Sequence, residues 1–166
     1  MSSANATRRP LRQPVSTVAV AGPGRRSTVS GVTRAHVRPP ASAVAAVALG
    51  GAVGASLRLA LESLAPWQPA GFPWATFGIN VFGCLLIGAL LAWLLGSAGQ
   101  PAWLRPFLAT GLLGGFTTFS AFAVESVRLL DAGAWGTAGS YVAGSLVLGL
   151  LAVRVGARLG ERGRAR

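Results

Sequence analysis

The hydrophobic positions of this sequence fall into four long runs, separated by short connections. The runs cover approximately residues 41–61, 73–96, 103–130 and 136–155. Each reaches the ~20 residues that an α-helix needs to cross the ~30 Å hydrocarbon core of a bilayer. The connections "ESLAPWQPAGF", "SAGQPA" and "DAGAW" contain the proline and glycine that turn a chain. The pattern predicts an all-α integral membrane protein with four transmembrane helices.

Composition agrees with a chain that has the lipid bilayer as its partner. Hydrophobic residues make up 52% of the sequence and charged residues 11%, about half the charged fraction of an ordinary soluble domain. We expect a four-helix membrane domain at residues 41–156. Residues 1–40, rich in Ser, Arg, Pro and Gly, predict a disordered basic N-terminal tail, and residues 157–166 predict a basic C-terminal tail.

The charge distribution predicts an orientation. The net charge of +11 comes from fifteen arginines and no lysine. Four spans place both termini on one side, together with thirteen of these arginines when Arg105 is included. This bias predicts cytoplasmic termini in the plasma membrane. Because no aromatic residue alternates with the tail arginines, a nucleic-acid partner is not expected.

The third run combines an apolar composition with residues that weaken a helix. Its centre, "GLLGGFTTFS", holds three glycines and three hydroxyl side chains. One interpretation is a discontinuous helix, whose freed carbonyls can bind a cation and whose amides and hydroxyls can hold an anion. The alternative is a packing kink, in which Thr117 and Thr118 bond back to the preceding turn.

Polar side chains in the other runs favour a lined path. Asn80 lies near the middle of the second run, with Thr76 one turn before it. Tyr141 and Ser145 are one turn apart in the fourth run. Such groups either join helices to one another or line a pore. Small residues four apart, in the pairs Gly50/Gly54, Gly111/Gly115 and Ser140/Gly144, predict close helix packing.

The remaining residues narrow the chemistry. Phe119 and Phe122 share a helix face; their ring edges are positive and suit an anion, although such a pair is often only core. No carboxylate lies at the middle of a run, which disfavours a proton-coupled exporter. One cysteine and one histidine exclude an ordinary zinc or iron site. No histidine lies near Ser120 in the membrane to activate it, so the chain is not expected to be an enzyme. Donors such as Arg58 suit a small, hard anion.

Four signatures occur in order along the runs: "GGAVGASLR", "TFGINVFGCLLIG", "GLLGGFTTFSAFAVE" and "SYVAGSLVLG". In these the chain resembles the Fluc (CrcB) family of fluoride-specific ion channels, from about residue 43 to 156. The resemblance implies four-helix subunits with a broken third helix that pair antiparallel, in a dual-topology type of dimer. It also implies two fluoride pores and a structural sodium ion at the dimer interface.

The resemblance implies roles for individual residues. The backbone carbonyls of Gly114 and Thr117 would hold the sodium, and Arg58 would lie at the vestibule end of the first helix. The residues that it assigns to the fluoride pore are Asn80, Thr118, Phe119, Ser120, Phe122, Tyr141 and Ser145.

This chain departs from the family pattern at two positions and in its charge. Ala121 and Gly149 stand where the family often has hydroxyl residues. The strong positive bias favours one fixed orientation, so the partner is either a second copy or an oppositely oriented homologue. The favoured function is a passive channel that exports cytoplasmic fluoride down its electrochemical gradient. The alternative is a non-conducting or partly conducting partner subunit in a heterodimer.

Overall fold

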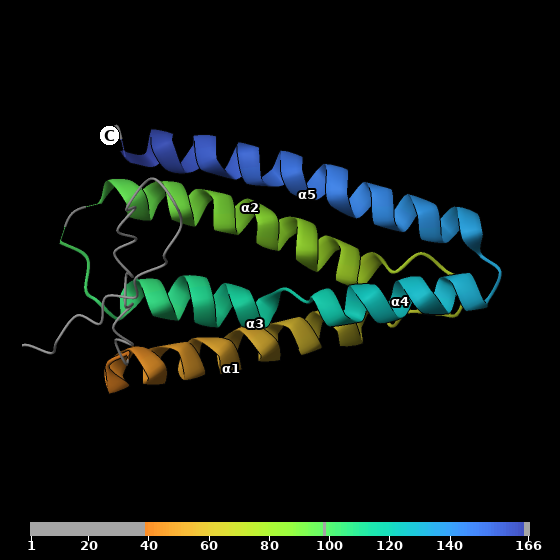
Figure 1. Cartoon of the computed structure of the whole chain (residues 1–166), viewed down its shortest axis with the longest axis horizontal. Coiled ribbons are helices and arrows are strands. Elements are labelled where there is room, and N and C mark those ends of the chain that lie inside the picture. Colours follow the sequence, from red (N-terminus) through yellow and green to blue (C-terminus); the bar gives the residue numbers. More distant parts are fainter. Residues whose placement is uncertain (1–38, 98, 165–166) are drawn as a thin grey trace, which may run out of the picture. The chain divides into compact units, whose positions relative to one another are not determined.

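The structure is a computed structural model that describes residues 39–97 and 99–164, all within one compact unit. Its helices alternate in direction along a common axis (Figure 1). Four helical segments are long and apolar enough to cross a membrane, which confirms the prediction of four such helices for the part described. The helices are α1 (Ala41–Leu64), α2 (Trp74–Gly96), the π-helix η1 (Pro106–Leu113), α3 (Gly114–Phe116), α4 (Phe119–Asp131) and α5 (Trp135–Arg164).

Two of the expected boundaries concern the ends of the chain. The tail expected at residues 1–40 lies, apart from its last two residues, outside the described residues. The basic C-terminal tail expected from residue 157 is helical as far as it is described, because α5 continues without a break to Arg164. Gly156 and Gly160 lie against the backbone of α2 there, so α2 supports the helix beyond the apolar run.

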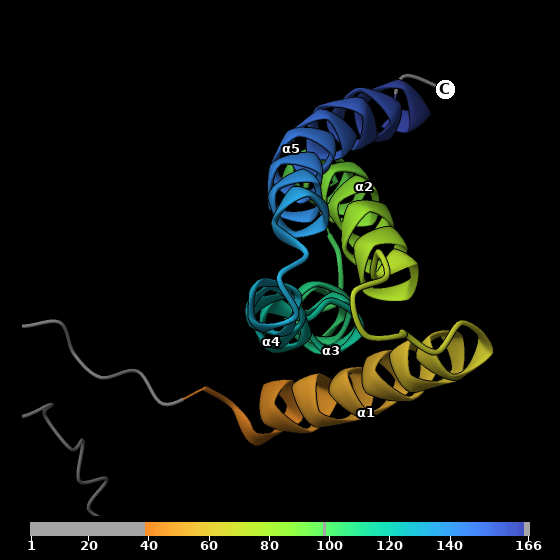
Figure 2. The same cartoon turned by 90° about the vertical axis from the view of Figure 1, so that its right-hand side faces the viewer.

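The third span, Pro106–Asp131, is made of η1, α3 and α4. In the end-on view of Figure 2 it lies between α1 on one side and the α2–α5 pair on the other. α1 packs mainly against η1 and α3, while α2 packs mainly against α5. η1 begins at Pro106, where proline's missing N–H costs no helical hydrogen bond. The third span is therefore the segment that joins the two helix pairs.

Glycines allow α1 and the third span to touch backbone to backbone. A Cβ atom on Gly111 would lie 2.7 Å from Val47 O, and one on Gly115 would lie 2.5 Å from Gly51 O. A Cβ on Gly50 would lie 2.9 Å from Leu112 N. These separations are too short for a side chain, so both predicted glycine pairs of this interface form a close helix contact.

The buried core is small, and most large apolar side chains face outward. Leu129, Ala138 and Tyr141 form a buried cluster, against which Phe77 and Phe122 pack. Large apolar residues on every long helix are exposed, including Leu49, Phe82, Val127 and Leu150. Outward apolar faces of this extent are expected where lipid, rather than water, surrounds a helix bundle.

Candidate functional site

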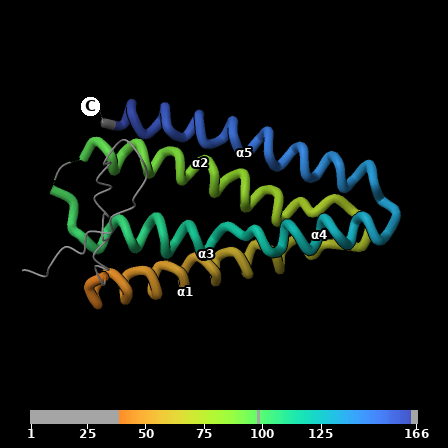
Figure 3. The backbone as a smooth tube through the Cα atoms, viewed as in Figure 1, coloured from red at the N-terminus to blue at the C-terminus, as the bar shows by residue number. Residues whose placement is uncertain are grey.

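The backbone of the third span changes direction at Thr117 and Thr118. α3 ends at Phe116, and Thr117 has φ −81° and ψ 154°. Thr118 has φ −144° and ψ 119°, and α4 begins at Phe119. Both residues are extended, and the tube straightens between α3 and α4 in Figure 3. Helix ends leave amides and carbonyls without helical partners, so this junction must bond elsewhere.

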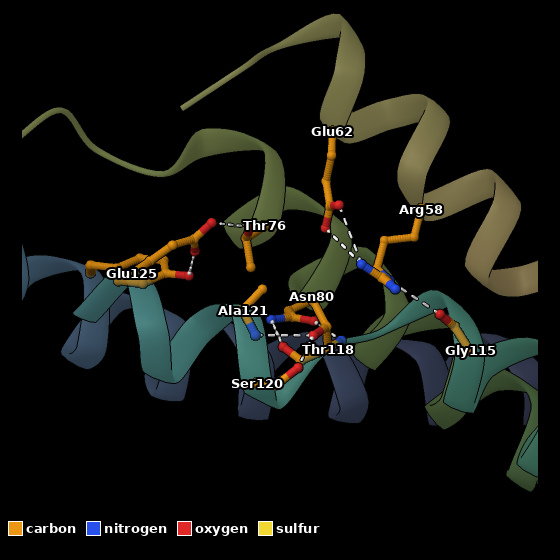
Figure 4. Close-up of polar contacts among 10 residues, drawn as sticks. Arg58, Glu62, Thr76, Asn80, Gly115, Thr118, Ser120, Ala121 and Glu125 are labelled. Carbon is orange, nitrogen blue, oxygen red and sulfur yellow. Dashed lines mark hydrogen bonds and ion pairs between the residues drawn. The ribbon is translucent and has the colours of Figure 1, made fainter. Parts of the chain in front are cut away.

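Asn80 of α2 bonds to both backbone groups of Thr118 (Figure 4). Its Nδ2 donates to Thr118 O at 3.0 Å, and Thr118 N donates to its Oδ1 at 2.9 Å. The amide side chain therefore replaces the partners that a continuous helix would have given Thr118. The Nδ2 group has two hydrogens, so one donor remains for another acceptor.

The two threonine hydroxyls act differently. Thr117 Oγ1 donates to Leu113 O at 2.9 Å, which is the backward bond of the packing-kink interpretation. Thr118 Oγ1 instead caps α4, because it accepts from Ala121 N at 3.2 Å. It also lies 3.1 Å from Ser120 Oγ. Side-chain capping of this kind typically stabilises a helix start by about 1 kcal/mol.

These bonds change the surroundings of the carbonyls of Gly114 and Thr117. In a continuous helix Gly114 O would accept from Thr118 N, and Thr117 O would accept from Ala121 N. Both amides donate to side-chain oxygens instead, to Asn80 Oδ1 and Thr118 Oγ1. The two carbonyls to which the family resemblance assigns a cation thus lose their regular helical donors.

Arg58 of α1 reaches a third carbonyl at the same junction. Its Nε donates to Gly115 O at 3.3 Å, and its Nη1 lies 3.2 Å from Glu62 Oε1 in an i, i+4 ion pair. Gly115 O would accept from the amide of Phe119 in a continuous helix. Arg58, which is partly buried, therefore lies beside the interruption, and Glu62 offsets its charge.

An open cavity of about 350 Å³, here called the site cavity, brings the predicted residues together. Its walls come from α2, η1, α3, the junction, α4 and α5. Ser120, Tyr141 and Arg58 do not line it. The predicted residues that do line it are Asn80, Gly114, Thr117, Thr118, Phe119, Phe122 and Ser145.

The two phenylalanines differ in their surroundings. Their ring centroids are 5.7 Å apart. Phe122 also packs against Tyr141, at 5.2 Å between centroids, and belongs to the periphery of the buried cluster. Phe119 is 80% exposed. The core interpretation therefore fits Phe122 but not Phe119, whose ring is available to whatever occupies or covers the site cavity.

Ser145 and Gly149 mark the α5 side of the site cavity. Ser145 Oγ is buried and has no hydrogen-bond partner among the residues that the structure describes. At Gly149, a Cβ atom would meet Cys84 Sγ at 3.4 Å. The sulfur of Cys84, which also lines the site cavity, therefore lies close to where a side chain at position 149 would begin.

Glu125, a carboxylate in the last part of the third span, links three helices. Glu125 Oε1 accepts from Thr76 Oγ1, and its Oε2 accepts from Tyr141 OH, both at 2.7 Å. Thr76 and Tyr141 are fully buried, so Glu125 links α2, α4 and α5 through two buried hydroxyls. The sequence spacing indicates that Glu125 faces the same way as Phe122, because it is three residues after Phe122 in a helix.

The membrane part of the chain matches a known protein family. The family described as "CrcB-like protein, Camphor Resistance (CrcB)" matches residues 45–157. This chain belongs to the CrcB family. The resemblance seen in its four sequence signatures is thereby confirmed.

Several curated members of the CrcB family are similar to this chain over most of their length. A protein of Mycobacterium bovis named fluoride-specific ion channel FluC 1 is 46% identical over 123 residues, 74% of this chain and 93% of the relative. FluC of Paracoccus denitrificans is 49% identical over 115 residues, covering 69% and 91%. FluC 2 of Streptomyces avermitilis is 43% identical over 129 residues, covering 78% and 77%.

These names describe ion channels, which are not a class of enzyme. Four apolar helices together with membership of this family make the chain a multi-pass membrane protein.

Proposed function

We propose that this chain is a subunit of a fluoride channel that lets cytoplasmic fluoride leave the cell passively, down its electrochemical gradient. The carrying observation is the open site cavity, where the 80% exposed Phe119 ring adjoins an interrupted helix braced by Asn80. The names of the relatives supply the ion.

The lining groups suit a small, strongly hydrated anion. The free Nδ2 hydrogen of Asn80, the hydroxyl of Ser145 and the positive edges of Phe119 and Phe122 replace part of its water shell. None of these groups is charged, so none holds the ion as tightly as an arginine would. Conduction needs binding that is favourable enough to enter and weak enough to leave.

The conducting form is an antiparallel dimer, with either a second copy or an oppositely oriented homologue. Its support is the exposure of Phe119 and the opening of the site cavity toward the outside of this chain. Thr118 lines the site cavity and its hydroxyl contacts that of Ser120, Tyr141 positions Phe122, and Arg58 lies at the vestibule.

A structural sodium ion at the centre of this dimer fits the donor set. Hard cations take oxygen ligands, and the carbonyls of Gly114 and Thr117 have lost their regular helical donors. One chain offers two such oxygens, and a second chain doubles the number. A bound cation would supply a fixed positive charge near the anion path.

Fluoride efflux from liposomes, followed with a fluoride electrode, tests the channel. We expect rapid fluoride efflux and no comparable chloride efflux. Phe119→Ile removes an exposed ring from the site cavity and should abolish fluoride efflux without changing assembly. Phe82→Ile removes an exposed ring of α2 that lies outside the site cavity, and it should leave fluoride efflux unchanged. Equal leakage of chloride and fluoride would end the proposal.

The sodium site is tested by replacing sodium on both sides of the membrane with an organic cation. Fluoride efflux should fall if the carbonyls of Gly114 and Thr117 hold sodium.

Where the partner is an oppositely oriented homologue, both termini of this chain lie on the cytoplasmic side of the plasma membrane. The support for this orientation is the arginine bias. The C-terminal part of α5 and the connection before η1 lie at the same end of the bundle (Figure 1), and their sequences contain Arg105, Arg158 and Arg162. Single cysteines introduced near either end of a Cys84→Ala chain should react only with reagent added from the cytoplasmic side. Equal labelling from both sides would instead indicate a dual-topology protein.

A partner subunit with an incomplete pore is the second candidate. Ala121 supplies no hydroxyl, and Cys84 Sγ lies 3.4 Å from the Cβ position of Gly149. If the chain conducts only together with an oppositely oriented homologue, this candidate replaces the homodimer.

A further inference from the structure

An apolar groove of about 410 Å³ runs between α2 and α5 on a face away from the site cavity. On α2, the cavity residues Asn80, Cys84 and Ile87 follow helical spacing and share one face. The groove uses a different set at the same spacing, so the two hollows open in different directions. The groove, here called the α2–α5 groove, is lined by Gly78, Phe82 and Leu85 of α2 and by Leu148, Leu151 and Val155 of α5.

The groove lies on a helix that is longer than the hydrocarbon core requires. α5 has 30 residues, which corresponds to about 45 Å of helix, whereas ~20 residues cross ~30 Å of hydrocarbon. With Trp135 near one interface, the final ten or so residues of α5 reach the other interface and the headgroup region beyond it. The α2–α5 groove therefore ends where phospholipid headgroups begin.

Arginines occupy that end of the groove. Arg158 and Arg162 follow Val155 by three and seven residues, so they continue the groove side of α5. Both are exposed. Neither makes an ion pair within residues 39–97 and 99–164. Gly156 and Gly160, on the opposite side of α5, lie against the α2 backbone and hold this segment in place.

We propose that the α2–α5 groove binds an anionic phospholipid. One acyl chain lies along Phe82, Leu151 and Val155, and the headgroup phosphate meets Arg158 and Arg162. An apolar groove that ends at two guanidinium groups matches the two parts of such a lipid: the groove suits the acyl chain, and guanidinium binds phosphate oxygens in a bidentate manner.

The arginine half of the proposal is tested by lipid retention. The purified full-length chain is incubated with equal amounts of phosphatidylglycerol and phosphatidylcholine, and retained lipid is counted by native mass spectrometry. We expect preferential retention of phosphatidylglycerol. An arginine near the membrane surface contributes enough to change this affinity about fivefold. Arg158→Gln and Arg162→Gln should each weaken retention by that factor, and Arg128→Gln, an exposed arginine near the opposite end, should not.

The role of the α2–α5 groove in binding the acyl chain is tested by placing a larger side chain in the groove. A Cβ atom at Gly78 would meet nothing within 4 Å, so Gly78→Leu places a side chain in the groove without a clash at its base. Gly139→Leu is the matched control, because position 139 is also open but lies outside the groove. Gly78→Leu should reduce phosphatidylglycerol retention severalfold, and Gly139→Leu should leave it unchanged.

Three results would overturn the proposal. They are equal retention of the two lipids, retention that is indifferent to both arginine variants, and a change of oligomeric state in Gly78→Leu with lipid retention unaltered. The last result would make the groove a contact between subunits. Because lipid retention is measured without any ion flux, the outcome is independent of the fluoride proposal.

Discussion

The two parts of the third span are held in place by different means. η1 and α3 touch α1 backbone to backbone, and side chains are absent at Gly111 and Gly115 because there is no room for them. α4 has no such contact; Thr76 and Tyr141 bond to its Glu125, and its first residue, Phe119, is 80% exposed. The first part is packed tightly against α1 of the same chain, whereas the second leaves the ring of Phe119 exposed to contact from outside the chain.

The largest effect is expected where the first part meets α1. A Cβ atom on Gly54 would overlap the backbone of Leu112 and lie 2.8 Å from Phe116 N. Gly54→Val should therefore destabilise the fold by about 3 kcal/mol or more, seen as loss of monodisperse protein in size-exclusion chromatography. Gly139→Val, at an open helical position, is the control. Equal behaviour of the two variants would show that the close contact does not determine stability.

A smaller effect is expected at the junction itself. Asn80→Leu removes both bonds to Thr118 and leaves its amide and carbonyl unpaired. Each unpaired group costs about 1–3 kcal/mol, so the thermal unfolding midpoint should fall together with fluoride efflux. Phe119→Ala should abolish efflux at an unchanged midpoint, because that ring is exposed. If Phe119→Ala destabilised the isolated subunit as much as Asn80→Leu, the contrast between a brace and an exposed ring would be lost.

The second part should respond next to loss of its buried hydroxyl bonds. Tyr141→Phe removes a 2.7 Å hydrogen bond to Glu125 and should cost about 1 kcal/mol, the usual net contribution of a hydrogen bond. The comparison is Ser126→Ala, whose hydroxyl bonds only to a carbonyl of its own helix, Phe122 O. Chemical denaturation in detergent measures both. A Tyr141→Phe midpoint equal to that of Ser126→Ala would contradict the role given to Glu125.

The smallest effect is expected for the ion pair beside the junction of the two parts. The side chains of Arg58 and Glu62 are 23% and 27% exposed, and pairs of this kind contribute about 0–1 kcal/mol. Glu62→Gln should therefore lower the free energy of unfolding by less than about 1 kcal/mol. The effect should appear only at low salt, because salt screens the pair. Arg58→Gln should cost slightly more, since Gly115 O also loses its donor. A shift that persists at high salt would refute a purely electrostatic contribution.

The four spans followed from sequence because apolar run length carries that information. The assignment of Asn80, Phe119 and Ser145 to one site came from the family resemblance, because helical spacing does not say which helices meet. The partners of Glu125 did not follow from sequence, since Thr76 and Tyr141 meet it through tertiary contacts between separate helices. The length of α5 did not follow from sequence for a similar reason. The apolar run ends near Val155, but contacts of Gly156 and Gly160 with α2 support the helix beyond it.

The π-helical geometry of η1 has a consequence for how the length of this chain can vary. A π-helix closes each hydrogen-bonded ring over five residues rather than four. Deleting one residue inside Pro106–Leu113 can therefore restore ordinary α spacing there while Gly115 and Thr118 keep their places. We therefore expect that one residue can be deleted from Pro106–Leu113 without moving the helix interruption at Thr117 and Thr118.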